Sequence, residues 1–138
     1  RVISMDPATR LLVVEVAEPD MHEPSGDLER LRRALREQWG MEDAVMPLPV
    51  LARLQGALRK GGWQVTVALW RGGPGPARIL DLWPGFHEGR LYGLAVDIGS
   101  TTVAAHLADL RNGTVKASAG VMNPQIRFGE DLMSRVSY

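Results

Sequence analysis

From residue 91 onward, three apolar runs follow one another with only tight turns between them, and this pattern restricts the fold more than any other feature of the chain. The runs that we predict to be strands are 94–96, 102–110 and 115–121. Asn112 and Gly113 join the second run to the third, and this dipeptide is the strongest short signal for a two-residue hairpin. The pattern therefore predicts an antiparallel β-meander.

Residues 11–83 show a different pattern, in which strands flank two helical segments. Leu11 to Val16 is apolar and β-branched, which is typical of a strand, and residues 63–70 and 78–83 read as two further strands. One helix is predicted to begin with Asp27 as its cap and to end at Gly40; a second begins at Pro47 or Pro49 and ends near Gly61. This order predicts a small sheet covered on one side by two helices.

The first of these helices carries several arginines on the face opposite its leucines. Because Glu29 and Glu37 lie among them, we interpret this face as a solvated surface and not as a phosphate site. The arginines in question are Arg30, Arg32, Arg33 and Arg36.

Composition excludes several classes of function. The 138 residues include 16 Lys and Arg against 16 Asp and Glu, so no net field attracts nucleic acid or a membrane surface. The absence of cysteine excludes an iron–sulfur cluster held by this chain. His22, His87 and His106 lie too far apart in the sequence to suggest a metal site. We expect a soluble, cytoplasmic protein, since no apolar run approaches the length of a membrane span.

The turn between the first two strands of the meander has the composition of a phosphate-binding loop. Gly99 permits positive φ and lets an anion approach the backbone amides, and Ser100, Thr101 and Thr102 add hydroxyl donors. Asp97 would repel a free phosphate, so a cation is expected between them, and Mg²⁺ accepts carboxylate and phosphate oxygens as ligands. The alternative is an ordinary hairpin at Gly99 and Ser100, in which Asp97 is only a local turn acceptor.

Three segments resemble one family, the reductive activators of corrinoid proteins. LAVDIGSTTVAAHLADL (94–110) is similar to the phosphate-1 loop of the actin, sugar kinase and heat-shock-protein superfamily, which many kinases and chaperones share. NPQIRFGEDLMSR (123–135) resembles this family more specifically, and DLERLRRALRE (27–37) is similar to its linker helix. The signature residues of the second segment are Asn123, Gln125, Asp131 and Arg135. Ser100, where threonine is commoner, and Glu130, where a small residue is usual, depart mildly from the family pattern.

The resemblance implies an α+β fold in which the helix-covered sheet is followed by the meander, and the meander opens an actin-like (ribonuclease H-like) nucleotide domain. It implies a linker domain at 1–40, a middle domain at 41–90 and an incomplete N-terminal portion of an actin-like ATPase domain at 91–138. The chain begins with Arg1 and has no initiator methionine. We therefore expect a piece of a longer protein that is catalytically inactive by itself.

For the longer protein the resemblance implies an ATP-dependent activator that returns a corrinoid protein's cobalt from Co(II) to Co(I). The electron would come from an iron–sulfur domain outside this chain, and the partner would be a corrinoid protein of a methyltransferase system. Asp97 would hold the magnesium of Mg-ATP through water, while Gly99, Ser100, Thr101 and Thr102 would bind phosphates. The signature residues either hold the first helix of the domain against the meander or act in catalysis.

Two other classes of function remain open at this point. The chain could belong to another kinase or chaperone of the same superfamily, which would share residues 94–103 but has no reason to contain the NPQ segment. It could also be a protein-docking module without nucleotide binding, in which residues 11–83 dock the corrinoid protein. Exposed strand edges in 91–138 lead us to expect a homodimer, strand exchange or disorder there.

Overall fold

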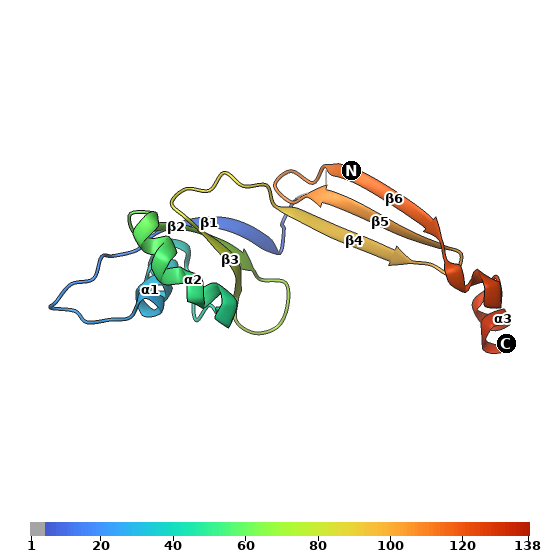
Figure 1. Ribbon diagram of the computed structural model, residues 1–138, viewed down its shortest axis with the longest axis horizontal. Helices are drawn as coiled ribbons and strands as arrows, with labels where there is room; N and C mark the ends of the chain where they lie inside the picture. The colour runs from blue at the N-terminus through green and yellow to red at the C-terminus, as the bar shows by residue number, and fades with distance from the viewer. Residues whose placement is uncertain (1–4) are drawn as a thin grey trace. The chain divides into compact units, whose positions relative to one another are not determined.

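The computed structural model describes residues 5–138 and divides them into two compact units (Figure 1). The helix-covered unit comprises residues 6–89, and the meander unit comprises residues 90–138 with Met5. Each unit contains one three-stranded antiparallel sheet. The predicted α+β class, with two helices over the first sheet and a meander as the second, is confirmed.

The helix-covered unit has the strand order β1-β2-β3. Its strands are β1 (Thr9–Glu15), β2 (Gln64–Trp70) and β3 (Arg78–Pro84), and its helices are α1 (Asp27–Trp39) and α2 (Leu48–Lys60). Both helices lie on the same side of the sheet (Figure 1). Alternate strand residues face them, because side chains along a strand point to opposite faces. The buried core therefore combines strand residues such as Val14 and Val67 with helix residues such as Leu31, Leu35, Leu54 and Leu58.

The predicted domain boundary between residues 40 and 41 does not appear in this unit. β1 precedes that boundary and β2 follows it, yet the two strands pair along their whole length, from Thr9 opposite Trp70 to Glu15 opposite Gln64. α1 and α2 also contribute leucines to the same core. A sheet shared across the boundary leaves neither half with a core of its own, and residues 6–89 form one unit.

Two predictions about α1 were wrong in detail. The cap is Gly26, without a side-chain hydrogen bond, and Asp27 instead accepts hydrogen bonds from Arg30 and, at 2.8 Å, from Arg59. Arg30 is only 7% exposed, although it was predicted to lie on a solvated face. Its guanidinium and that of Arg59 both lie near the Trp63 ring, at 5.8 and 5.0 Å from the ring centroid. Ion pairing and cation–π contacts offset the cost of burying Arg30.

The meander unit follows the order β4-β5-β6, with β4 at Tyr92–Ile98, β5 at Thr102–Asp109 and β6 at Val115–Met122. A short 3-10 helix, η1 (Pro124–Phe128), and one turn of α helix, α3 (Leu132–Val136), come after it. The register places Val96 opposite Ala105 and Ala105 opposite Ala119. This arrangement confirms the antiparallel meander that the three apolar runs predicted.

The two faces of the meander differ in chemistry. One face is apolar and carries Leu94, Val96 and Ile98 of β4 with their partners Leu107, Ala105 and Val103 of β5. The β4 residues of this face are exposed, Leu94 at 67% and Ile98 at 75%. The other face carries Asp97, Thr102 and His106, and His106 Nδ1 lies 2.8 Å from the hydroxyl of Ser118.

The turn between β5 and β6 is longer than the predicted two-residue hairpin. Asp109 N–H donates to Thr114 O at 2.8 Å, so four residues, 110–113, lie inside the loop. Gly113 has φ 74° and donates its N–H to Asp109 O at 2.8 Å. The carboxylate of Asp109, which is 1% exposed, accepts hydrogen bonds from the backbone and side chain of Arg111. These bonds favour the wider turn over the two-residue form.

Candidate functional site

The candidate site is the loop of residues 99–102 that joins β4 to β5. Gly99 N–H donates to Thr102 O at 2.9 Å, which closes the hairpin with Ser100 and Thr101 between the two bonded residues. Gly99 is not among the described residues with positive φ, contrary to the reason predicted for glycine there. The space around it supplies the reason, because a Cβ at this position would lie 2.8 Å from Thr102 O. Glycine thus allows the two backbone segments to approach each other.

Every carbonyl oxygen of residues 99–101 accepts a hydrogen bond from the segment that follows β6. Gly99 O accepts one from the Nδ2 of Asn123 at 2.9 Å. Ser100 O accepts one from the guanidinium of Arg135. Thr101 O accepts one from the backbone N–H of Asn123 at 2.8 Å. Two signature residues that are distant in sequence therefore hold the backbone of the loop.

The donors of the loop, in contrast, have no partner among the residues that the structure describes. Among the described residues, no acceptor lies within hydrogen-bonding distance of the backbone N–H of Ser100 or Thr101. The hydroxyls of Ser100, Thr101 and Thr102 likewise have no partner within residues 5–138. Ser100, Thr101 and Thr102 are exposed. Free amides next to one another, with hydroxyls beside them, are the donors that bind phosphate oxygens.

Asp97 lies on the same face of the meander as Thr102. It pairs with Ala104, and Thr102 precedes Ala104 by two residues, which returns a strand side chain to the same face. The carboxylate of Asp97 is exposed and forms no hydrogen bond or ion pair with any described residue. The structure thus places the acid and the last hydroxyl residue of the loop on one face of the meander.

The signature residues have distinct structural roles. Asn123, only 5% exposed, is the N-cap of η1 and accepts the N–H of Gln125 at 2.9 Å. Asp131 caps α3, and its pKa is held below the usual range by hydrogen bonds from the backbone N–H and the hydroxyl of Ser134. Arg135 also donates from Nε to Gly129 O at 2.8 Å. The side chain of Gln125 is exposed.

Metal-ligating side chains do not gather elsewhere in the described chain. Within residues 5–138 no group of three or more His, Asp or Glu is placed to hold a metal ion.

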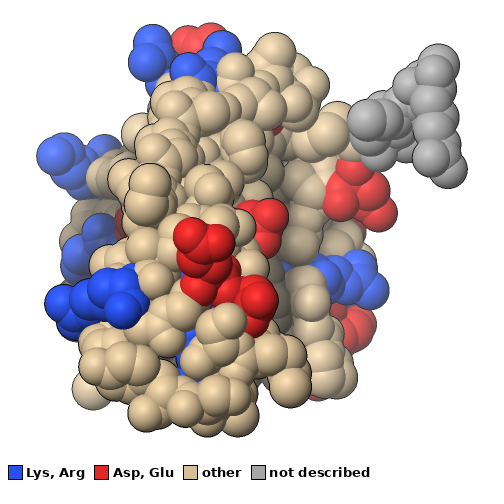
Figure 2. All heavy atoms as spheres, turned by 90° about the vertical axis from the view of Figure 1, so that its right-hand side faces the viewer, with Lys and Arg blue, Asp and Glu red and all other residues tan. Residues whose placement is uncertain are grey.

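No helix of the described part is long and apolar enough to cross a membrane. The face drawn in Figure 2 carries acidic and basic side chains together with a larger uncharged area, which agrees with the balanced charge of the chain.

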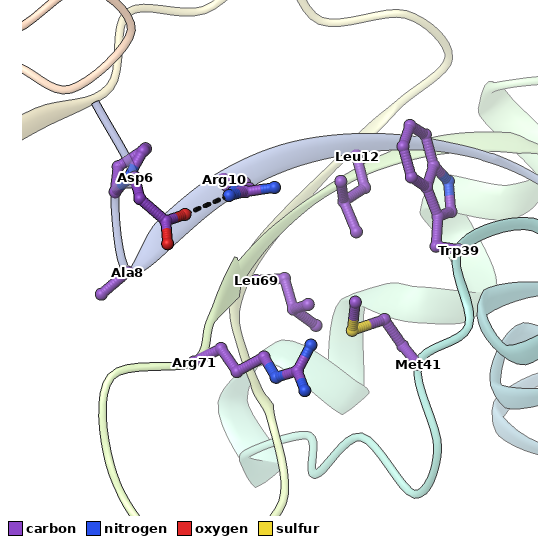
Figure 3. A pocket seen from close by; sticks show the side chains of 9 residues that line it. Asp6, Ala8, Arg10, Leu12, Trp39, Met41, Leu69 and Arg71 are labelled. Atoms are coloured by element: carbon purple, nitrogen blue, oxygen red, sulfur yellow. Dashed lines mark hydrogen bonds and ion pairs between the residues drawn. The ribbon is translucent and has the colours of Figure 1, made fainter. Parts of the chain in front are cut away.

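A cavity of about 480 Å³ lies in the helix-covered unit, between residues of β1, of β2 and of the end of α1. Figure 3 shows Trp39, Met41 and Leu69 among its lining residues and the ion pair between Asp6 and Arg10 at its edge. Its volume suits a small ligand. None of the residues that the sequence predicted for nucleotide binding lines it, so the loop at 99–102 remains the candidate phosphate site.

The fold and the loop together define a class: an α+β chain in which a helix-covered sheet is followed by a meander with a glycine and hydroxyl loop. Residues 1–89 match the model of the RACo linker region, and residues 92–138 match the model of the RACo middle region. The linker match alone covers more than half of the chain. The chain therefore belongs to the RACo family.

Two known proteins resemble the chain. The corrinoid activation enzyme RamQ of Eubacterium limosum is 39% identical over 62 residues, which is 44% of this chain and 10% of that protein. The solved structure of a reductive activator for a corrinoid, iron–sulfur protein matches with a TM-score of 0.86 and 32% identity. It covers 100% of this chain, which spans 22% of its length. The chain is thus much shorter than both relatives.

The family matches divide the chain at the same place as the structure does. The linker match ends at residue 89 and the middle match begins at residue 92, while the compact units meet between Gly89 and Arg90. The resemblance had assigned only 1–40 to the linker and 41–90 to the middle domain. The segment that carries the loop, which was expected to open the nucleotide domain, falls in the match to the middle region.

Proposed function

We propose that this chain is the linker and middle part of an ATP-dependent reductive activator, and that its loop at 99–102 receives phosphates of Mg-ATP. RamQ, a corrinoid activation enzyme, and the solved relative, a reductive activator for a corrinoid, iron–sulfur protein, support corrinoid activation as the function of the longer protein. The proposed partner is a corrinoid protein of a methyltransferase system.

One observation carries the nucleotide part of the proposal. The loop carbonyls are all engaged by the protein, while the N–H groups of Ser100 and Thr101 have no acceptor among the described residues. An ordinary hairpin has no need for such a division, because its carbonyls could face water equally well. A loop that directs donors outward and holds its acceptors inward is suited to an anion.

The residues present also fit magnesium. Asp97 supplies one carboxylate that has no partner within residues 5–138, on the face that carries Thr102. Mg²⁺ usually takes one or two carboxylates together with phosphate oxygens and keeps several waters. When bound, Mg²⁺ would neutralise phosphate charge that Asp97 would otherwise repel. Gly99, Ser100, Thr101 and Thr102 would bind the phosphates themselves.

The redox step is assigned to the longer protein. One electron from an iron–sulfur cluster reduces Co(II) of the corrinoid to Co(I), and this chain, which has no cysteine, holds no such cluster. Nucleotide binding can favour the transfer-competent state only by binding that state more tightly. A single loop lacks most of the charge stabilisation that phosphoryl transfer requires, so we propose that the 138-residue chain does not hydrolyse ATP by itself.

Titration of the 138-residue chain with Mg-ATP, followed by the amide resonances of Ser100 and Thr101, tests the proposal. We expect saturable shifts at these two amides, with no comparable shift in the turn of residues 110–113. Saturable shifts elsewhere with none in the loop would refute the nucleotide site and favour a docking module.

A charge substitution at Asp97 tests the role of the metal. We expect Asp97→Asn to weaken binding of Mg-ATP about tenfold, the effect of losing one charge-assisted contact of roughly 1.4 kcal/mol. The same substitution should strengthen binding of ATP in the presence of EDTA, because it removes a negative charge next to the phosphates. If Asp97→Asn changes the affinity for ATP equally with and without magnesium, Asp97 does not contact the metal. Both affinities can be measured by the same resonance titration.

A further inference from the structure

We infer that Asn123 and Arg135 are positioning residues that aim the amides of the loop at the phosphates. This inference rests on the proposed function and assigns a role to the two family-signature residues that bond to the loop. Both contacts join segments far apart in the sequence, Asn123 to Gly99 over 24 residues and Arg135 to Ser100 over 35 residues.

The geometry of the peptide bond supplies the mechanism. In a trans peptide, the C=O of one residue and the N–H of the next lie in one plane and point in opposite directions. A bond that holds Gly99 O therefore orients Ser100 N–H, and a bond that holds Ser100 O orients Thr101 N–H. Asn123 Nδ2 forms the first bond at 2.9 Å, and the guanidinium of Arg135 forms the second. The two side chains thus direct the two amides that lack acceptors in the described part of the chain.

Asn123 is suited to hold the loop rigidly. It is 5% exposed and engages through three groups: its Nδ2 donates to Gly99 O, its N–H donates to Thr101 O, and its Oδ1 accepts from Gln125 N–H. Burying a side-chain amide costs little free energy when both its donor and its acceptor are hydrogen-bonded. Removing one of those bonds costs much more, because a buried polar group is then left without a partner. The loop and η1 are therefore fixed to each other through one side chain.

Arg135 connects the loop to α3 in the same way. Its Nε donates to Gly129 O at 2.8 Å and its Nη2 donates to Ser100 O. Arginine can make these two contacts at once because its donors are fixed in one plane, whereas the single ammonium of lysine cannot reproduce the fork. The positive charge also lies beside the loop, where it favours an anion.

The first experiment separates positioning from capping at Asn123. Asn123→Asp keeps the acceptor for Gln125 N–H but removes the donor to Gly99 O. We expect this substitution to weaken Mg-ATP binding about tenfold and to raise the backbone mobility of Ser100 in ¹⁵N relaxation without nucleotide. The matched control is Gln125→Glu, which adds the same charge to the same segment and removes no bond to the loop.

The second experiment addresses Arg135. Arg135→Lys keeps the positive charge but cannot form both guanidinium hydrogen bonds at once. We expect it to weaken Mg-ATP binding about threefold to tenfold and to raise the backbone mobility of Thr101. Arg127→Lys is the control, because Arg127 lies over the ring of Phe128 at 4.6 Å and has no bond to the loop.

The outcomes distinguish this inference from the proposed function. If the wild-type chain does not bind Mg-ATP, the proposed function fails, and unchanged loop mobility in the variants would overturn the positioning role separately. If wild type binds, variants that match their controls in affinity and in loop mobility would overturn the inference alone. Reduced affinity with an equally ordered loop would also overturn it, because the side chains would then act on the ligand and not on the amides.

Discussion

The two units of this chain differ in whether they bury hydrophobic residues. All of the hydrophobic residues that are buried in the described chain lie between Leu12 and Leu82, in the helix-covered unit. The buried residues of the meander unit are both polar, Asp109 and Asn123. Asp109 holds the turn after β5, and Asn123 holds the loop before β5, so one buried polar residue serves each end of this strand.

The two sheets are therefore stabilised by different forces. The first sheet packs leucines and valines against two helices, which makes hydrophobic burial its main source of stability. The meander leaves Leu94, Val96 and Ile98 exposed and depends on its strand pairing and on the hydrogen bonds of its turns. Substitutions should therefore affect the two units by different mechanisms.

The largest effect is expected from a leucine of the helix-covered core. Leu58 is 0% exposed, so Leu58→Ala should destabilise this unit by about 2–5 kcal/mol through lost burial and a residual cavity. Urea unfolding followed by tryptophan fluorescence measures it, because Trp39, Trp63, Trp70 and Trp83 all lie in this unit.

Leu94→Ala is the matched control in the meander. Leu94 is 67% exposed, so this change should alter the free energy of unfolding by only about 0.5 kcal/mol or less, as followed by the amide resonances of β4 and β5. A loss as large as that of Leu58→Ala would mean that the apolar face is covered, and would break the contrast between the units.

An intermediate effect is expected at Gly99. A Cβ there would lie 2.8 Å from Thr102 O, so Gly99→Ala should open the hairpin end at a cost of about 1–3 kcal/mol and weaken Mg-ATP binding. Gly120→Ala is the control within the same sheet, since its Cβ would meet only Val103 O at 3.9 Å. The amide spectra of the two variants are compared with the wild-type spectrum. If the spectrum of Gly99→Ala is as close to wild type as that of Gly120→Ala, Gly99 does not approach Thr102 O as closely as the structure shows.

A further effect depends on pH. The hydrogen bonds from the side chain and then the backbone of Arg111 lower the pKa of Asp109 from 3.8 to about 2. Because the carboxylate has the lower pKa in the folded state, its contribution is complete above about pH 4 and is lost as the pH falls toward 2. Stability of the meander, followed by β5 and β6 amide resonances in urea, should decline in that window. Asp109→Asn should lack this part of the decline, and an unchanged profile in the variant would exclude Asp109 as its source.

Much of the fold followed from local pattern. Apolar periodicity and turn residues predicted every strand and both covering helices to within a few residues, because each element buries a face that its own sequence defines. Gly40, which adopts φ 64° at the end of α1, also ended the helix as predicted. Predictions from local sequence patterns were wrong where a residue from another segment determines whether a side chain is buried. Arg30 was predicted to be solvated because Trp63, which comes after α2 in the chain, could not be placed beside it from periodicity.

The residues of the candidate site could be predicted from the sequence, but the contacts that hold them in place could not. Asp97 and the hydroxyl residues of 100–102 could be chosen because their chemistry lies in one short segment. The roles of Asn123 and Arg135 depend on contacts over 24 and 35 residues, which no spacing rule predicts. The same holds for Gly99, where a tertiary approach, and not a positive φ, explains the residue.

Hydrogen exchange at the amides of Ser100 and Thr101 measures whether these two N–H groups are open to solvent and available to phosphate. We predict fast exchange in the chain alone and marked slowing at saturating Mg-ATP, with no slowing for the amides of residues 110–113. If these amides are already protected without nucleotide, or if their exchange stays fast when Mg-ATP is bound, the loop is not the phosphate site.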